Sequence, residues 1–191
     1  MNTNLISPEG RLSFPYLSEP CRTFDASNDK LEVTLIFPSD VDIQPMLDGV
    51  EKAAIEKFGT TKYDALVKSG KFKSPFKSNS TKIDDDGNPR QGFEDAAGTH
   101  VKFTCKFGIK VVDSKLQAIE PDLAKAGYWG RVRCSFAAYD SGANVGVSAY
   151  FKTLQVTKLD EEFGSGDALE GFGIVASENA FNKPVQEDQP F

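Results

Sequence analysis

The sequence is poor in the residues that metal sites and hydrolytic catalysis need, with one histidine and three cysteines among 191 residues. Cys21, Cys105 and Cys134 are isolated and form no CxxC pair, so neither a zinc site nor a disulfide framework is expected. No GxSxG motif or P-loop accompanies His100, which excludes the common hydrolytic triads. We therefore expect a protein without catalytic residues, metal or cofactor.

Long hydrophobic segments are also absent. No apolar run approaches the roughly 20 residues that a membrane helix needs, and the N-terminal MNTNLISPEG lacks the basic and apolar regions of a signal peptide. These absences predict a soluble, intracellular protein with no membrane partner. Hydrophobic residues still make up 39% of the chain, including 15 phenylalanines, so a core can form.

Charge is distributed unevenly along the chain. Residues 160–191 carry eight acids against the single base Lys183, a net charge of −7, whereas residues 1–159 carry 21 bases and 20 acids, a net of +1. We expect one domain over 1–159 and a flexible acidic tail over 160–191. A near-neutral body with basic patches and an anionic tail that can occupy them is typical of a nucleic-acid binder that competes with its own tail, although a disordered solubilising tail explains the charge equally well.

Alternation of apolar and polar residues predicts strands over residues 11–17, 30–37, 99–110, 128–139 and 145–159. Helical spacing predicts a helix over 42–58, with Asp42 as N-cap and Gly59 at its end, and a shorter one over 62–68. Many short strands with one central helix and a closing hairpin favour a mainly β protein. We expect a five-stranded OB-fold barrel with helical insertions, with an immunoglobulin-like sandwich as the alternative.

Two stretches set aromatic residues among cations. In residues 68–82 (KSGKFKSPFKSNSTK), Phe72 and Phe76 lie among five lysines, which suits stacking on bases and contact with phosphates. An exposed loop held by two buried phenylalanines is the alternative. In YWGRVRCSFAAY, Trp129 shares one face with Arg131 and Arg133, which suggests a base-stacking surface.

The strand over residues 99–110 has two chemically different faces. Val101, Phe103, Cys105, Phe107 and Ile109 should face the core, and Cys105 should be a buried free thiol, as should Cys134. Lys102, Lys106 and Lys110 should face solvent. His100 is expected with them, as a surface residue.

The turn-rich segment 83–95 is the one candidate metal site. Asp84, Asp86 and Asn88 resemble a calcium loop, but Pro89 replaces its glycine and Asp95 its bidentate glutamate. A two-metal nuclease could use Asp84, Asp85, Asp86, Glu94 and Asp95. A solvated acidic loop explains these residues without a metal.

Four segments carry a resemblance to a known family. RLSFPYL, DDDGNPRQGFEDAAG and WGRVRCSFAAYD resemble the single-stranded DNA-binding proteins of tailed phages over most of residues 10–160. The ending EDQPF is similar to the acidic tips of bacterial and phage single-stranded DNA-binding proteins. Unlike those tips, this tail is sparsely acidic and contains apolar residues, which leaves its docking on the body or on a second subunit open.

The resemblance implies an OB fold and binding to single strands without sequence preference, in phage replication, recombination or repair in the host cytoplasm. It also implies that the tail recruits replication and recombination proteins through Phe191, supported by Glu187, Asp188 and Pro190. The predicted DNA-contacting residues are Phe72, Lys73, Phe76, Lys77, Lys102, Lys106, Tyr128, Trp129, Arg131, Arg133, Tyr150 and Lys152. A monomer or homodimer is expected. The alternatives are a phage structural or assembly protein without DNA affinity, an RNA binder, or the metal-dependent nuclease.

Overall fold

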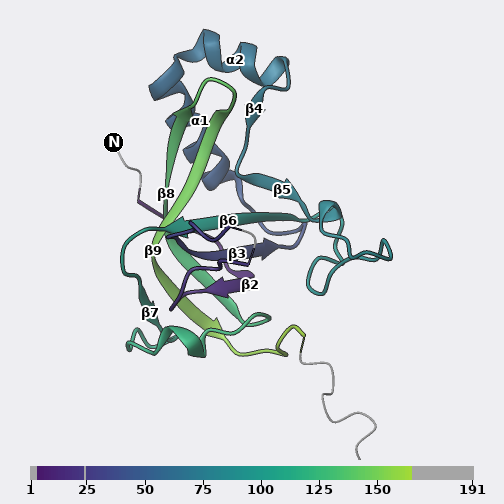
Figure 1. Cartoon of the computed structure of the whole chain (residues 1–191), viewed down its shortest axis with the longest axis vertical. Helices are drawn as coiled ribbons and strands as arrows, with labels where there is room; N and C mark the ends of the chain where they lie inside the picture. Colours follow the sequence, from purple (N-terminus) through teal and green to yellow (C-terminus); the bar gives the residue numbers. More distant parts are fainter. Residues whose placement is uncertain (1–3, 24, 165–191) are drawn as a thin grey trace, which may run out of the picture.

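The computed structural model describes residues 4–23 and 25–164, arranged as a curved sheet with two helices at one end (Figure 1). Its strands are β1 (Leu5–Ile6), β2 (Gly10–Tyr16), β3 (Leu31–Phe37), β4 (Phe72–Lys73), β5 (Phe76–Ser78), β6 (Thr99–Cys105), β7 (Lys110–Val112), β8 (Trp129–Asp140) and β9 (Val145–Lys158). The helices are α1 (Gln44–Phe58) and α2 (Thr60–Lys68), with 3-10 turns at Asn79–Thr81 and Pro121–Leu123.

Five of these strands pair into a closed ring. β2 pairs with β3, β3 with β6, β8 with β9 and β8 with β2, all antiparallel, and the parallel pair of β6 with β9 completes the circuit. The expectation of a mainly β protein built on five principal strands is confirmed. A ring leaves no long edge among these strands, which is how small β proteins avoid pairing with other chains.

The core fills the inside of this ring, as the alternation of the strands requires. Fully buried side chains come from every strand of the ring, namely Leu12, Val33, Leu35, Phe37, Val101, Phe103, Val132, Cys134, Phe151 and Leu154. Cys105 and Cys134 are buried free thiols, as predicted, and burial raises the pKa of Cys134 to about 12. On the opposite face the exposure varies: Lys102, Arg131 and Arg133 are exposed, whereas Thr34, Ile36 and His100 are buried.

The long β8–β9 hairpin extends beyond the ring toward the two helices, at the top of Figure 1. Helix α1 packs Met46, Val50 and Ala54 into the core and lies against β8. It begins two residues later than predicted, and Asp42 accepts a hydrogen bond from the Gln44 amide at 2.9 Å. An ion pair of Lys62 with Asp140, at 3.3 Å, joins α2 to the end of the hairpin.

One predicted core residue is misplaced. Phe107 was expected beside Phe103 in the core, but 82% of it is exposed. The strand ends at Cys105, and the chain turns before β7 begins at Lys110, so the period-2 pattern no longer decides which way Phe107 points. Within the described part of the chain no helix has the length and apolar character needed to cross a membrane.

Candidate nucleic-acid interface

The outer surface of β2, β3 and β6, here called the β3/β6 face, has its side chains aligned by cross-strand pairing. Arg11 of β2 lies opposite Ile36 of β3, which lies opposite His100 of β6. One step along, Thr34 pairs with Lys102. These residues alternate with the core positions, so all of them lie on the outer side of the ring. Thr34, Ile36 and His100 are buried there beneath neighbouring groups, whereas Arg11 is partly exposed and Lys102 is exposed.

Four cations gather on and beside this face: Lys77, Lys82, Arg90 and Lys102. Burial, followed by the positive charges of Lys77, Arg90 and Lys102, lowers the pKa of Lys82. Lys102 pairs with Glu32 at 2.5 Å, but Lys77, Lys82 and Arg90 form no ion pair with another described residue. The cluster therefore has an excess of positive charge suited to a phosphate backbone.

Phe14 stands at the edge of this cluster in an unusual backbone conformation. Its φ is +49°, at a β-bulge between Ser13 and Tyr16. Such a conformation costs a bulky residue on the order of 1–3 kcal/mol and occurs preferentially at functional sites. Its exposed ring lies 5.5 Å from the Lys82 ammonium group. The bulge thus presents an aromatic ring to solvent among cations.

A cavity of about 450 Å³ opens beside Phe14, lined also by Tyr16, Arg90, Gln91 and Phe163. Sequence reasoning did not identify Phe14, Tyr16, Lys82 or Arg90 as site residues. The signal available was the Phe-Pro-Tyr run, because a proline within a strand marks an edge or a bulge.

His100 lies beneath the cluster, and the expectation that it is a surface residue is wrong. It is 3% exposed, because Asn79, from the turn that follows β5, and Phe93 pack against its ring. Its Nδ1 lies 3.2 Å from Asn79 Oδ1, and Phe93 packs edge-on at 5.2 Å. Burial, then the charges of Lys82 and Lys77, lower its pKa to about 4, so His100 is neutral at pH 7.

Residues 160–164 lie across one end of the β3/β6 face. Asp160 Oδ2 accepts a hydrogen bond from Trp129 Nε1 at 2.7 Å, and this bond is the main cause of the lowered pKa of Asp160. The Arg11 guanidinium group lies 6.0 Å from the Trp129 ring and 4.6 Å from the Phe163 ring. A Cβ atom on Gly92 would come within 2.2 Å of the Phe163 ring, so the glycine makes room for this contact.

The structure separates Trp129 from the two arginines that share its strand. Trp129 lines a small cavity with Arg11 and Ile36, whereas Arg131 and Arg133 line another, of about 410 Å³. We call the second cavity the arginine groove, and its other lining residues are Ile6, Val112, Leu116, Val132, Thr153 and Gln155. A register shift between Trp129 and Gly130 accompanies this divergence.

The two phenylalanines of the basic stretch 68–82 are half-buried. Phe72 packs edge-on against Tyr63 at 5.3 Å, and Phe76 packs against Phe136 at 6.4 Å. Both rings lie against the hydrophobic core. The Tyr128 hydroxyl donates a hydrogen bond to Glu162 at 3.2 Å.

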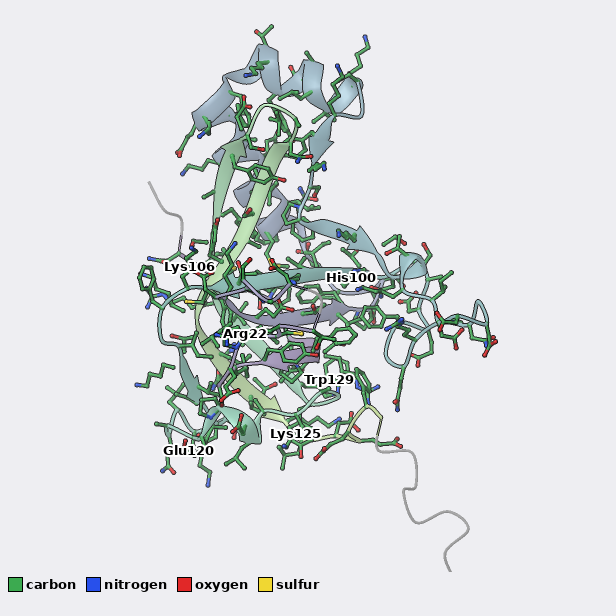
Figure 2. The ribbon with its side chains drawn as sticks, viewed as in Figure 1. Arg22, His100, Lys106, Glu120, Lys125 and Trp129 are labelled. Carbon is green, nitrogen blue, oxygen red and sulfur yellow. The ribbon has the colours of Figure 1, made fainter. Side chains whose placement is uncertain are left out.

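The remaining predicted residues are lysines and one exposed tyrosine. Lys73 hydrogen-bonds Asn144 and Lys106 pairs with Asp29 at 3.1 Å, while Tyr150 and Lys152 are exposed on β9. Figure 2 shows Lys106 and His100 toward opposite ends of β6.

The predicted tail residues Glu187, Asp188, Pro190 and Phe191 lie outside the described residues. No three His, Cys, Asp or Glu side chains in 4–23 and 25–164 lie close enough to hold a metal ion.

Comparison with known proteins decides which family this arrangement represents. Residues 3–190 match the model of the family described as Enterobacter phage Enc34, ssDNA-binding protein. The chain belongs to this family. The resemblance read from the sequence is thereby confirmed, as is the expectation of a non-enzymatic protein. A search of the curated proteins finds no match.

Solved structures show the same fold at low sequence identity. The single-stranded DNA-binding protein of bacteriophage Enc34 in complex with ssDNA has a TM-score of 0.63 and 19% identity, over 83% of this chain and 88% of that one. The gp2.5 single-stranded DNA-binding protein of bacteriophage T7 has a TM-score of 0.58 and 19% identity, over 93% of this chain and all of that one.

Proposed function

We propose that this protein binds single-stranded DNA without sequence preference through its β3/β6 face. The observation that carries the proposal is the exposed Phe14 ring, held at positive φ beside Lys82, together with Lys77 and Arg90, which form no ion pair with another described residue. Stacking on aromatic rings and contact with phosphates discriminate little between bases, because every base has a π-face and every nucleotide a phosphate.

The proposed path of the DNA strand follows from where the aromatic and basic groups lie. One base stacks on Phe14 and the cavity beside it receives the next, with Tyr16 on its wall. Lys77, Lys82, Arg90 and Lys102 take the phosphates. Of the residues predicted from sequence, Lys77 and Lys102 lie on this path, and Lys106 continues it at the far end of β6.

The protein acts in phage DNA replication, recombination or repair in the host cytoplasm, where it protects single strands. The acidic segment 160–191 competes with DNA and recruits replication or recombination proteins through Glu187, Asp188, Pro190 and Phe191. The competition is supported by residues 160–164, because Phe163 lines the same cavity as Phe14 and contacts Arg11. Asp160 adds a carboxylate within 3.9 Å of Arg11 and 4.0 Å of Lys158.

The test is a fluorescence-anisotropy titration of the full chain with a labelled single strand, its duplex and the matching RNA, at low and moderate salt. We expect the single DNA strand to bind more tightly than the duplex, with an affinity that falls as salt rises. If no oligonucleotide binds at low salt, the proposal fails and the alternative of a phage structural protein takes its place. If RNA binds more tightly than DNA, the ligand class is wrong.

A further inference from the structure

The arginine groove lies on the outside of the β8–β9 hairpin, away from the cations of the β3/β6 face. Arg131 and Arg133 are two residues apart on β8, so their side chains leave the same face of the strand about 7 Å apart. Both are exposed, and neither forms an ion pair with a described residue. Two guanidinium groups with no acidic partner in 4–23 and 25–164 favour an anionic ligand.

The groove is built to hold one of these arginines in place. Gln155 Oε1 accepts a hydrogen bond from Arg131 Nε at 2.8 Å. The amide nitrogen of Gln155 is itself fixed by the backbone carbonyls of Asp113 and Ser114, at 3.2 and 3.3 Å. Arg131 is thus oriented through Nε while its two Nη groups remain for a ligand, the pre-organised geometry that suits phosphate.

The outer surface is continuous between the β3/β6 face and this groove. Thr104 of β6 pairs with Glu32 on one side and with Tyr150 of β9 on the other. Tyr150 in turn pairs with Ser135 of β8. At the next step Lys152 is the extra residue of a β-bulge, between the pairs of Thr153 with Arg133 and Phe151 with Cys134. Exposed Tyr150 and Lys152 therefore connect the two surfaces.

We propose that the arginine groove is a second contact surface for the phosphate backbone of the same DNA strand, reached over Tyr150 and Lys152. A long DNA strand then follows the outside of the ring from the β3/β6 face to the β8–β9 hairpin, whereas a short DNA strand occupies the β3/β6 face alone. This inference rests on the proposed function. An acidic peptide is the competing ligand, because Ile6 and Leu116 add apolar surface to the groove. The continuity with the β3/β6 face favours DNA.

The test compares full-length wild-type protein with the Arg131→Ala/Arg133→Ala variant on single strands of about 6 and about 20 nucleotides, lengths that bracket the footprint of one OB fold. We expect the variant to bind the short strand within twofold of wild type. On the long strand the slope of log K against log salt should fall by about 1.4, since each phosphate contact contributes about 0.7.

The matched control is Lys52→Ala/Lys57→Ala, which removes the same charge from exposed positions of helix α1. It should leave the salt slope on the long strand unchanged, and circular dichroism checks that both variants fold. If wild type binds both strands and the arginine variant matches it on the long one, the inference is overturned while the proposed function stands. An unchanged long-strand slope with lost binding of an EDQPF peptide would assign the groove to protein instead. If wild type binds neither strand, the proposed function itself fails.

Discussion

The β3/β6 face and the arginine groove both carry cations that form no ion pair with another described residue, and both border cavities of similar volume, about 450 and 410 Å³. They differ in their aromatic groups. The face carries Phe14 in a strained backbone beside its cavity, and residues 160–164 lie over part of it. The groove has two arginines and no aromatic ring among its lining residues. Positive charge alone therefore does not distinguish a surface that stacks bases from one that contacts only the phosphate backbone of DNA. The aromatic ring makes that distinction.

Removing that ring is the change with the largest expected effect. Phe14→Gly deletes the aromatic group at a position where glycine accepts positive φ without strain, so the bulge should persist. Affinity for a short single strand should fall by about 5- to 150-fold, the equivalent of the 1–3 kcal/mol that one stacked base contributes. Anisotropy measures this loss, and thermal unfolding should show no destabilisation.

The control for this change is Val67→Ala, which removes exposed apolar surface from helix α2, away from both surfaces. It should bind DNA as wild type does. Equal affinity of Phe14→Gly and wild type would remove the distinction drawn between the two surfaces.

The buried histidine gives the β3/β6 side of the ring a pH dependence. The pKa of His100 is about 4 in the folded protein and near 6.5 in the unfolded chain, so below pH 6.5 the unfolded chain binds a proton that the folded one does not. Stability is therefore lost as pH falls toward 4. From pH 7 to 5, wild type should lose about 2 kcal/mol more than His100→Gln.

Urea unfolding of both proteins at the two pH values provides this comparison. Each protein is its own reference, so a change in stability caused by the substitution itself does not interfere. Parallel pH profiles of the two proteins would show that His100 is not held neutral.

Lys82 tests the charge of the face separately from its aromatic ring. Lys82→Ala should lower the salt slope for a short strand by about 0.7, the value of one phosphate contact. Removing Lys82 also relieves its repulsion with Lys77, Arg90 and Lys102, so the folded protein should be slightly stabilised while its DNA binding weakens. Lys52→Ala is the matched control and should leave the salt slope unchanged. If Lys82→Ala also has the salt slope of wild type, Lys82 does not contact a phosphate.

The smallest expected effect concerns residues 160–164. Phe163→Ala removes the contact with Arg11, and a cation–π contact at such a site contributes roughly 0.5–1 kcal/mol. DNA affinity should therefore rise by about two- to fivefold. A fall in affinity on titration would mean that Phe163 stacks on DNA instead of competing with it.

Much of the fold could be predicted, because strand alternation carries the information locally. Val132, Cys134 and Phe136 are buried while Arg131 and Arg133 are exposed, as the period of two requires. By the same rule Val147 and Phe151 of β9 are buried and Lys152 is exposed.

The errors arise where distant parts of the chain decide the outcome. His100 was expected outside because its strand position points outward, but Asn79 and Phe93 cover it. Phe14 was overlooked because a positive φ at a bulge is not encoded in apolar periodicity. Trp129 and Arg131 share a strand face in sequence but line different cavities, since a register shift between Trp129 and Gly130 interrupts the alternation.

The most direct test of the central claim is an NMR titration of the full-length, isotope-labelled protein with a single strand of about 6 nucleotides. Our account predicts the largest amide shift changes in Gly10–Tyr16 and Thr99–Cys105 and in the segment around Lys82, with little change at Arg131, Arg133 and Gln155. Shift changes concentrated on the β8–β9 hairpin or on helix α1, with the β3/β6 face unaffected, would contradict it.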